Sequence, residues 1–379
     1  MIIRFLSFVF LILSISQNVK AQNDSIQNQT AKQSDFPWFA AWHPRTARYC
    51  TGINYGAIWA HNKPVYHLAQ SHPVQIFGEI HFRKLERLWC KNYRAASAGV
   101  NITYIDYRSN VLGKSIAAIT FLEPWLRKNM SFRIGTGVVY NSNPFDLQSN
   151  STNLMLGSRF AMVMHCQISR TFCYRSSFSR AKYPYLRLGI GLTHFSNGAF
   201  SQPNSGINNL FISAGYCFGE QGHEYAYKHP PTFPTDSLSF SIASSFSVVE
   251  KFPVGGPKYA VHQIQGRVRY RIGKLSRLQT GLDWMKNQSV AAEIKEQPQL
   301  GTQAAVLGIP FGHELLISQK LSMITELGVY IYKRHQLHPG MYQRYGLRYQ
   351  LWPGSFTGIM LKTHLGKAEC LELNIGYQL

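Results

Sequence analysis

The chain has little apolar sequence that is continuous. Phe5 to Ile15 form an apolar run that is too short for a comfortable transmembrane helix, and no longer run follows it. Arg4 precedes the run, and Val19 and Ala21 are the small residues that a signal peptidase reads. We therefore predict a secretory signal peptide over residues 1–21, with an uncleaved anchor as the alternative, and no spanning helix in the rest of the chain. A soluble secreted β-sandwich and a transmembrane β-barrel both remain open.

Acidic residues are also scarce. The chain has 18 Asp and Glu against 39 Lys and Arg, a net charge of +21, and loss of Arg4 and Lys20 with the signal leaves +19. Such an excess indicates an anionic partner, or serves only solubility. An exported chain rarely meets nucleic acid, so we predict no nucleic-acid partner. Phosphorylated lipid headgroups at a bacterial surface are the better candidate.

Metal-ligand patterns are missing as well. The cysteines form no CxxC pair, so neither zinc nor another cofactor is indicated. His223 and His229 lie among prolines and are interpreted as solvated linker residues. An export compartment permits disulfides, and Cys166 and Cys173 are spaced to bridge a turn. The six cysteines are Cys50, Cys90, Cys166, Cys173, Cys217 and Cys370.

What the chain does contain is alternation. Residues 22–48 are polar, and from residue 49 to 379 segments of roughly ten residues alternate in polarity, which is the barrel-strand pattern. In the last segment Leu373 and Ile375 share one face, and Glu372 and Asn374 share the other. Within Val261 to Ile272 three arginines share a face, and we expect them to point into a wet interior rather than into lipid.

The predicted fold is therefore all-β, an antiparallel transmembrane β-barrel in the bacterial outer membrane. We count about twelve to sixteen strands, and sixteen is the preferred number. The stretch Gly219 to Asp236 resembles a linker and divides the barrel region into residues 49–218 and 237–379. Two small barrels in tandem are an alternative, and we favour one larger barrel because a second free-standing barrel in one chain would be unusual.

The segment from Tyr183 to Phe218 contains the candidate chemistry. It is predicted to form strand, loop and strand, with even-numbered residues such as Leu188 facing lipid. His194 and Ser196 share that face, about 7 Å apart along the strand. Asn208 of the next strand lies beside them. A Ser–His pair with a third orienting group can make a serine nucleophilic. The alternative is an ordinary polar rim at the membrane interface.

A family resemblance supports the chemical interpretation. His194-Phe195-Ser196-Asn197-Gly198, followed by Gln202-Pro203-Asn204 and Gly206, resembles the active-site region of the PagL-type lipid A 3-O-deacylases. It is also similar to the related acyloxyacyl hydrolases. The resemblance is strong from Leu186 to Phe218 and more diffuse from Gly52 onward. The second half, with Lys362-Thr363-His364-Leu365, resembles longer members of the acyloxyacyl hydrolase group.

The resemblance implies a role for each residue of the motif. Ser196 would be the nucleophile, His194 the general base, and Asn197 or the Gly198 N–H the oxyanion donor. The family's acid is a glutamate, and its position falls on Asn208, which can orient an imidazole but cannot offset its charge. Asp106 is a possible substitute acid.

The implied function is an outer-membrane esterase that removes an ester-linked acyl chain from lipid A of lipopolysaccharide in the outer leaflet, without a metal. The competing class is a non-enzymatic porin-like or lipid-binding barrel that retains this segment.

Overall fold

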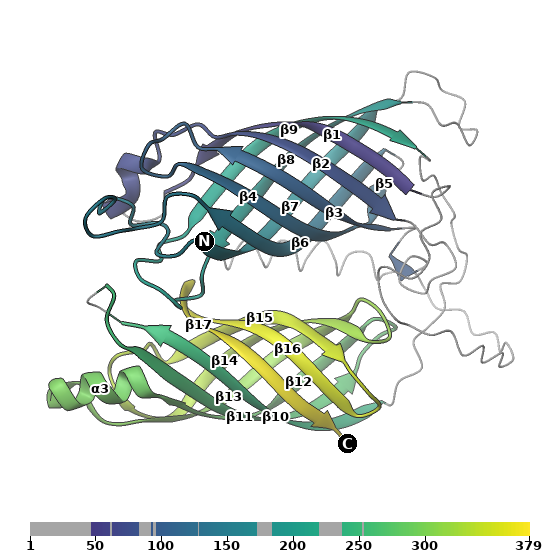
Figure 1. Cartoon of the computed structure of the whole chain (residues 1–379). Helices are drawn as coiled ribbons and strands as arrows, with labels where there is room; N and C mark the ends of the chain where they lie inside the picture. Colours follow the sequence, from purple (N-terminus) through teal and green to yellow (C-terminus); the bar gives the residue numbers. More distant parts are fainter. Residues whose placement is uncertain are drawn as a thin grey trace, which may run out of the picture.

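The computed structural model describes residues 47–60, 63–82, 92–93, 96–127, 129–172, 184–219, 237–251 and 254–379. The predicted signal peptide, most of the polar segment that follows it, and the linker with His223 and His229 lie outside these residues. The described chain forms two closed antiparallel barrels, which lie side by side in Figure 1.

The first barrel closes through pairing of β1 with β9 and of β4 with β6. The short strand β5 (Trp125–Arg127) pairs with the start of β6. The eight strands of the ring are β1 (Ala47–Ile58), β2 (Val74–Phe82), β3 (Ser97–Asp106), β4 (Lys114–Glu123), β6 (Met130–Asn141), β7 (Phe160–Phe172), β8 (Tyr185–Ser196) and β9 (Ile207–Gly219).

The second barrel closes through pairing of β10 with β17. Its connections carry helix α3 (Gln288–Glu296) and the 3-10 turn η3 (Pro298–Leu300), and the first barrel carries η2 (Lys63–Leu68). The strands are β10 (Leu238–Glu250), β11 (Lys258–Arg271), β12 (Ser276–Asn287), β13 (Gly301–Leu316), β14 (Leu321–His335), β15 (Met341–Gln350), β16 (Ser355–His364) and β17 (Lys367–Gln378).

The predicted class, an antiparallel β-barrel, is confirmed, but the preference for one larger barrel is wrong. Eight strands close before the linker and eight more close after it. Closure depends on hydrogen bonds between the first and last strand of each set, such as Cys50 opposite Cys217. Alternation along one strand says nothing about a pairing so distant in sequence, so the strand pattern could not separate one ring from two.

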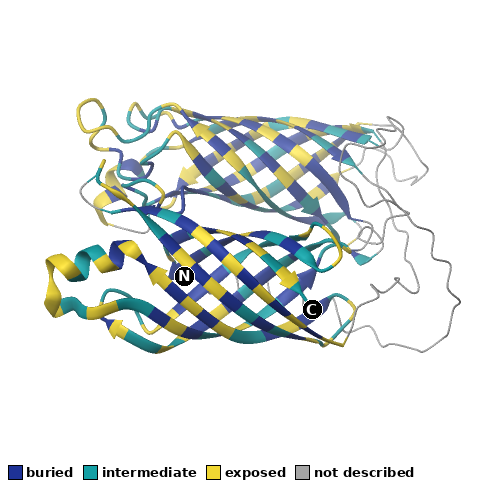
Figure 2. Ribbon diagram, turned by 60° about the horizontal axis from the view of Figure 1, so that its bottom comes forward, coloured by how far each residue is buried: buried dark blue, intermediate teal, exposed yellow. Residues whose placement is uncertain are grey.

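Alternation decides which side chains face out and which face in, as the chequered burial pattern of Figure 2 shows. On β8, Leu186, Leu188 and Ile190 are exposed between inward residues. On β11, Ile264 is exposed while Arg267 is buried. The prediction that the arginines avoid the lipid side is therefore confirmed there. Among the described residues, no helix combines the length and apolarity needed to span a membrane.

The two interiors are filled rather than wet. In the first barrel Arg133 lies 2.5 Å from Glu123 and also pairs with Glu79. In the second, Arg344 lies 2.8 Å from Asp283, Glu326 and Glu372. Two cavities beside these networks measure about 10 Å³ and 20 Å³, room for roughly one water each. The expected wet lumen is therefore replaced by buried ion pairs, as the small radius of an eight-stranded barrel requires.

One end of the molecule, here called the α3 end, carries the β8–β9 connection and helix α3 (Figure 1). An apolar cluster fills the first barrel at this end and fixes the strand ends. Phe195 and Ile207, the neighbours of the candidate site residues, are completely buried in it. At the opposite end the barrels touch where Tyr93 donates a hydrogen bond to the Leu316 carbonyl at 2.6 Å.

The buried charges of the first barrel generate a stability prediction. Glu79 accepts hydrogen bonds from both Arg133 and Arg187 in the lumen. Glu79→Gln leaves two buried guanidinium groups with one anionic partner fewer, and should destabilise the barrel by about 3–5 kcal/mol. Urea unfolding in lipid vesicles, followed by gel mobility of the folded form, measures this. The exposed Glu296→Gln is the control, expected within about 0.5 kcal/mol of wild type; equal stability of the two variants would contradict the prediction.

Candidate active site

The site lies at the α3 end of β8 and β9, where an apolar strand face meets a loop. The register sets His194 directly opposite Asn208. Both are half-buried members of the face that carries the exposed Leu188 and Ile190. Their side chains therefore point away from the lumen, on the side of the barrel that faces lipid.

A short hydrogen bond joins these two residues. His194 Nδ1 lies 2.7 Å from Asn208 Oδ1. The Asn208 amide nitrogen donates to the Trp59 carbonyl at 3.4 Å, so the amide oxygen is the group that faces the imidazole. Because that oxygen can only accept, the hydrogen bond puts a proton on His194 Nδ1. In the neutral imidazole, Nε2 then has the lone pair that a general base requires.

Ser196 follows two residues later on β8 and is only 8% exposed. Its Oγ accepts a hydrogen bond from Asn204 Nδ2 at 3.0 Å and from the Gly198 N–H at 3.3 Å. Asn204 Oδ1 in turn accepts from Ser196 Oγ at 3.3 Å and from the Asn197 N–H at 3.0 Å. The hydroxyl is thus fixed in place by the loop that follows it.

The loop between β8 and β9 is held by the first barrel itself. Asn197 donates through its side chain to Ser158 Oγ at 3.0 Å and to the Ser201 carbonyl at 2.8 Å. The Gly206 N–H donates to the Met155 carbonyl at 2.9 Å. The side chain of Asn197, predicted as one of two oxyanion donors, is therefore occupied in holding the loop. The Gly198 N–H is the donor that points at Ser196.

The second barrel holds the same loop from the other side. The Glu250 N–H donates to the Ala199 carbonyl at 3.0 Å, and Ser201 Oγ donates to Glu250 Oε2 at 3.2 Å. The Lys258 ammonium lies 3.6 Å from the centre of the Phe200 ring. The residues that flank the nucleophile therefore contact both barrels.

Gly198 is the tightest point of this contact. Its φ of +66° is in the left-handed region that favours glycine. A Cβ at this position would lie 2.9 Å from the Leu371 Cβ of β17, closer than side chains pack. Both the backbone conformation and the second barrel therefore require glycine next to the candidate nucleophile.

Asp106 is not the substitute acid. It lies on β3, and β2, β1 and β9 separate that strand from β8 in the sheet. Its carboxylate accepts a hydrogen bond from the Arg108 N–H at 2.8 Å, within its own turn. Asp106 was a candidate because it ends a predicted strand, and the position of a residue on its own strand does not reveal the order of strands around the barrel.

Asn204 and Glu250 are the contributors that sequence reasoning missed. Asn204 stands within the motif that carries the family resemblance, but spacing gave it no role. Glu250 lies 54 residues from Ser196 and in the other barrel, and no signal in the sequence connects the two.

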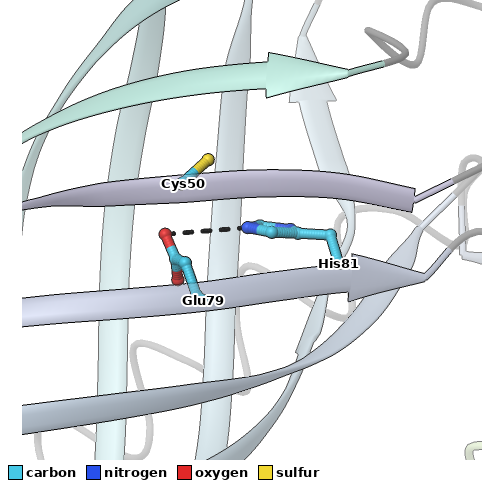
Figure 3. Close-up of side chains that lie close together, drawn as sticks. All are labelled: Cys50, Glu79 and His81. Atoms are coloured by element: carbon cyan, nitrogen blue, oxygen red, sulfur yellow. Dashed lines mark ion pairs between the residues drawn. The ribbon is translucent and has the colours of Figure 1, made fainter.

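The first barrel also contains a group that resembles a metal site. Ligand atoms of Cys50, Glu79 and His81 lie within 4.8 Å of one another, on β1 and β2 (Figure 3). Cys50, however, forms a disulfide with Cys217, and Glu79 is engaged by buried arginines. These residues are therefore structural. The proposed bridge from Cys166 is wrong, because Cys166 is a free thiol.

Comparison with solved structures finds a siderophore receptor and porins. The siderophore receptor PirA from Pseudomonas aeruginosa is 8% identical, with 88% of this chain and 80% of that chain covered and a TM-score of 0.21. The NanC porin is 8% identical, with 86% and 97% covered and a TM-score of 0.18. The KdgM porin is 5% identical, with 87% and 97% covered and a TM-score of 0.18.

Family models give the more specific result. No curated protein matches the chain. The lipid A 3-O-deacylase (PagL) model matches residues 78–217, which include His194, Ser196 and Asn208. The acyloxyacyl hydrolase C-terminal domain model matches residues 237–379, the second barrel. The chain therefore belongs to the family of PagL-type lipid A 3-O-deacylases and acyloxyacyl hydrolases.

Proposed function

We propose that the protein hydrolyses an acyl ester of lipid A in the outer leaflet of the outer membrane, with Ser196 as nucleophile and His194 as general base. The observation that carries this proposal is the 2.7 Å hydrogen bond between His194 Nδ1 and Asn208 Oδ1. In the neutral imidazole this bond puts the proton on Nδ1 and the lone pair on Nε2, and it fixes the plane of the ring. Membership of the lipid A deacylase family supports the substrate class and the kind of reaction.

The reaction proceeds through an acyl-enzyme. Ser196 Oγ attacks the ester carbonyl carbon while its proton passes to His194 Nε2. The Gly198 N–H, which lies beside Oγ, donates to the oxyanion that forms. When the intermediate collapses, the carbon–oxygen bond to the sugar breaks and His194 returns the proton to the leaving hydroxyl. Water then cleaves the acyl-enzyme by the same steps, and the fatty acid is released.

The position of the site suits a membrane lipid. Exposed apolar side chains continue the His194 face toward the middle of the strands, including Ile190 and Ile212, each 62% exposed. An acyl chain can lie against them without leaving the bilayer. Lys258 and Arg159 are exposed cations near the loop between β8 and β9. We propose that these side chains bind the phosphates of lipid A.

The porin-like alternative lacks a supporting observation. Across the described residues the interior of each barrel is occupied by ion pairs, and the cavities beside them are of water size. A ring of eight strands leaves interior space only for side chains or one small ligand, which does not favour a porin.

Ser196→Ala should abolish deacylation while leaving insertion intact. Loss of a serine nucleophile lowers turnover by at least about a thousandfold. Mass spectrometry of lipid A from cells with and without each variant measures the acylation state. Ser205→Ala is the matched control, because that residue anchors the same loop through its backbone N–H to Leu154. Wild-type deacylation by Ser196→Ala would exclude the acyl-enzyme route.

Asn208→Glu tests the role of the unusual partner. A carboxylate at this position would offset the charge of the imidazolium that forms during attack, so kcat should rise by about tenfold or more. Asn208→Ala removes the acceptor that holds Nδ1–H and should lower kcat. Fatty-acid release from lipopolysaccharide in detergent micelles follows both variants. Equal rates for Glu, Asn and Ala at this position would mean that His194 needs no orienting group.

The contact with the second barrel gives a separate prediction. Ser201→Ala removes the hydrogen bond to Glu250 and loosens the loop that carries Ser196 and Gly198. We expect kcat to fall by about tenfold with KM nearly unchanged, because small misplacement of reacting groups is costly. Glu250→Ala, which removes the acceptor, should do the same, and the double variant should lose no more than either single variant if the two residues act as a pair. Fully additive losses would show that the contact between them is irrelevant to turnover.

A further inference from the structure

A second cluster of chemically capable side chains lies in the second barrel at the α3 end. His338 lies in the connection between β14 and β15, His364 ends β16, and Glu369 is near the start of β17. Their ligand atoms all lie within 4.8 Å of one another. His338 Nδ1 is 3.8 Å and His364 Nδ1 3.5 Å from the Glu369 carboxylate, and the two rings stack at 4.4 Å.

The neighbours of this cluster hold it in the way that outer contacts hold metal ligands. Tyr330 Oη lies 2.9 Å from His364 Nε2, so Nδ1 of that ring is the nitrogen that faces Glu369. Asn287 donates to Glu369 Oε1 at 3.1 Å, and Lys362 lies 2.7 Å from Oε2. An ionised carboxylate has about four lone-pair positions, so two contacts leave room for a metal.

His335 provides an independent observation. Its side chain is 5% exposed, and its ring packs edge-on against His338 with centres 5.2 Å apart. Its Nδ1 is buried and has no hydrogen-bond partner within the described part of the chain. A buried ring nitrogen without a partner is costly, and it stands next to two other imidazoles and a carboxylate.

We propose that His338, His364 and Glu369 bind a divalent transition-metal ion such as Zn²⁺, with His335 available as a fourth ligand. Two or three imidazole nitrogens and one carboxylate are a donor set that suits zinc and its neighbours. His338, with 20% of its side chain exposed, opens the site toward the α3 end and gives the ion a path of entry.

Charge determines which ions the site prefers. The Lys362 ammonium already neutralises the Glu369 carboxylate. A hard cation such as Ca²⁺ or Mg²⁺, which depends on oxygen ligands, therefore finds little attraction there. The imidazoles must supply the affinity, and they favour Zn²⁺, Co²⁺ and Ni²⁺. The site is independent of the esterase proposal and departs from the sequence-based expectation of a metal-free protein.

Cobalt titration of the full-length protein tests the site without reference to activity. The protein is folded in detergent, stripped with EDTA, freed of chelator and titrated with Co²⁺, whose visible absorption reports its coordination. We expect one equivalent of Co²⁺ to bind, with the visible absorption of an ion that has four or five ligands. Zn²⁺ should displace the bound Co²⁺, whereas Ca²⁺ and Mg²⁺ should leave the absorption unchanged. Failure of the wild-type protein to bind Co²⁺ would overturn the proposal.

Variants locate the ion. His338→Ala is the decisive change, because the residue lies in a connection and is partly exposed, so the barrel should still fold; Co²⁺ affinity should fall at least about tenfold. His364→Ala should behave alike. His262→Ala is the matched control, since His262 is an exposed histidine of the same barrel. Gel mobility verifies folding of each variant. Unchanged Co²⁺ binding by His338→Ala and His364→Ala, or an equal loss in His262→Ala, would also overturn the proposal.

Discussion

Closure of an eight-stranded ring is the constraint on which the rest of this structure depends. A ring of this size leaves space inside for side chains only, and the chain fills that space with buried ion pairs such as Arg133 with Glu123. Each buried charge needs its partner, so the interior cannot be opened without loss of stability. Chemistry is thereby confined to the outer face and to the strand ends. The candidate catalytic residues lie where these two regions meet.

The period-two alternation of a strand makes part of this arrangement predictable from the sequence. Leu188 and Ile190 identify the lipid face of β8, and His194 shares it by parity; the structure does place Asn208 beside that imidazole. The roles of these residues stay predictions. What the pattern could not reveal is everything set by distant pairing: two rings in place of one, the contact of Glu250 with the loop, and the position of Asp106. Those features depend on which strands meet, and local polarity carries no such information.

Asparagine in place of the family's glutamate has a physical rationale at this location. The position is half-buried and faces lipid, where an ionised carboxylate is expensive. Asn208 keeps the acceptor that orients His194 and adds no charge to the membrane face. The cost falls on the transition state, because the imidazolium then forms without an anionic partner. With asparagine the protein gives up electrostatic stabilisation of the imidazolium and avoids a charge on the lipid-facing surface. The fixed loop and the Gly198 N–H remain to stabilise the oxyanion.

The two barrels show how the inward or outward parity of a strand position decides what a histidine in the same local sequence can contact. The seventh strand of each ring carries a Thr-His pair at or near its end, Thr193-His194 on β8 and Thr363-His364 on β16. On β8 the inward positions are odd-numbered, so His194 faces lipid; on β16 they are even-numbered, so His364 is buried. The second histidine therefore meets Glu369 inside the barrel and has no access to a membrane ester. A duplicated strand pattern thus yields one candidate base and one candidate metal ligand, and the second barrel contributes to the esterase site through the loop that it holds.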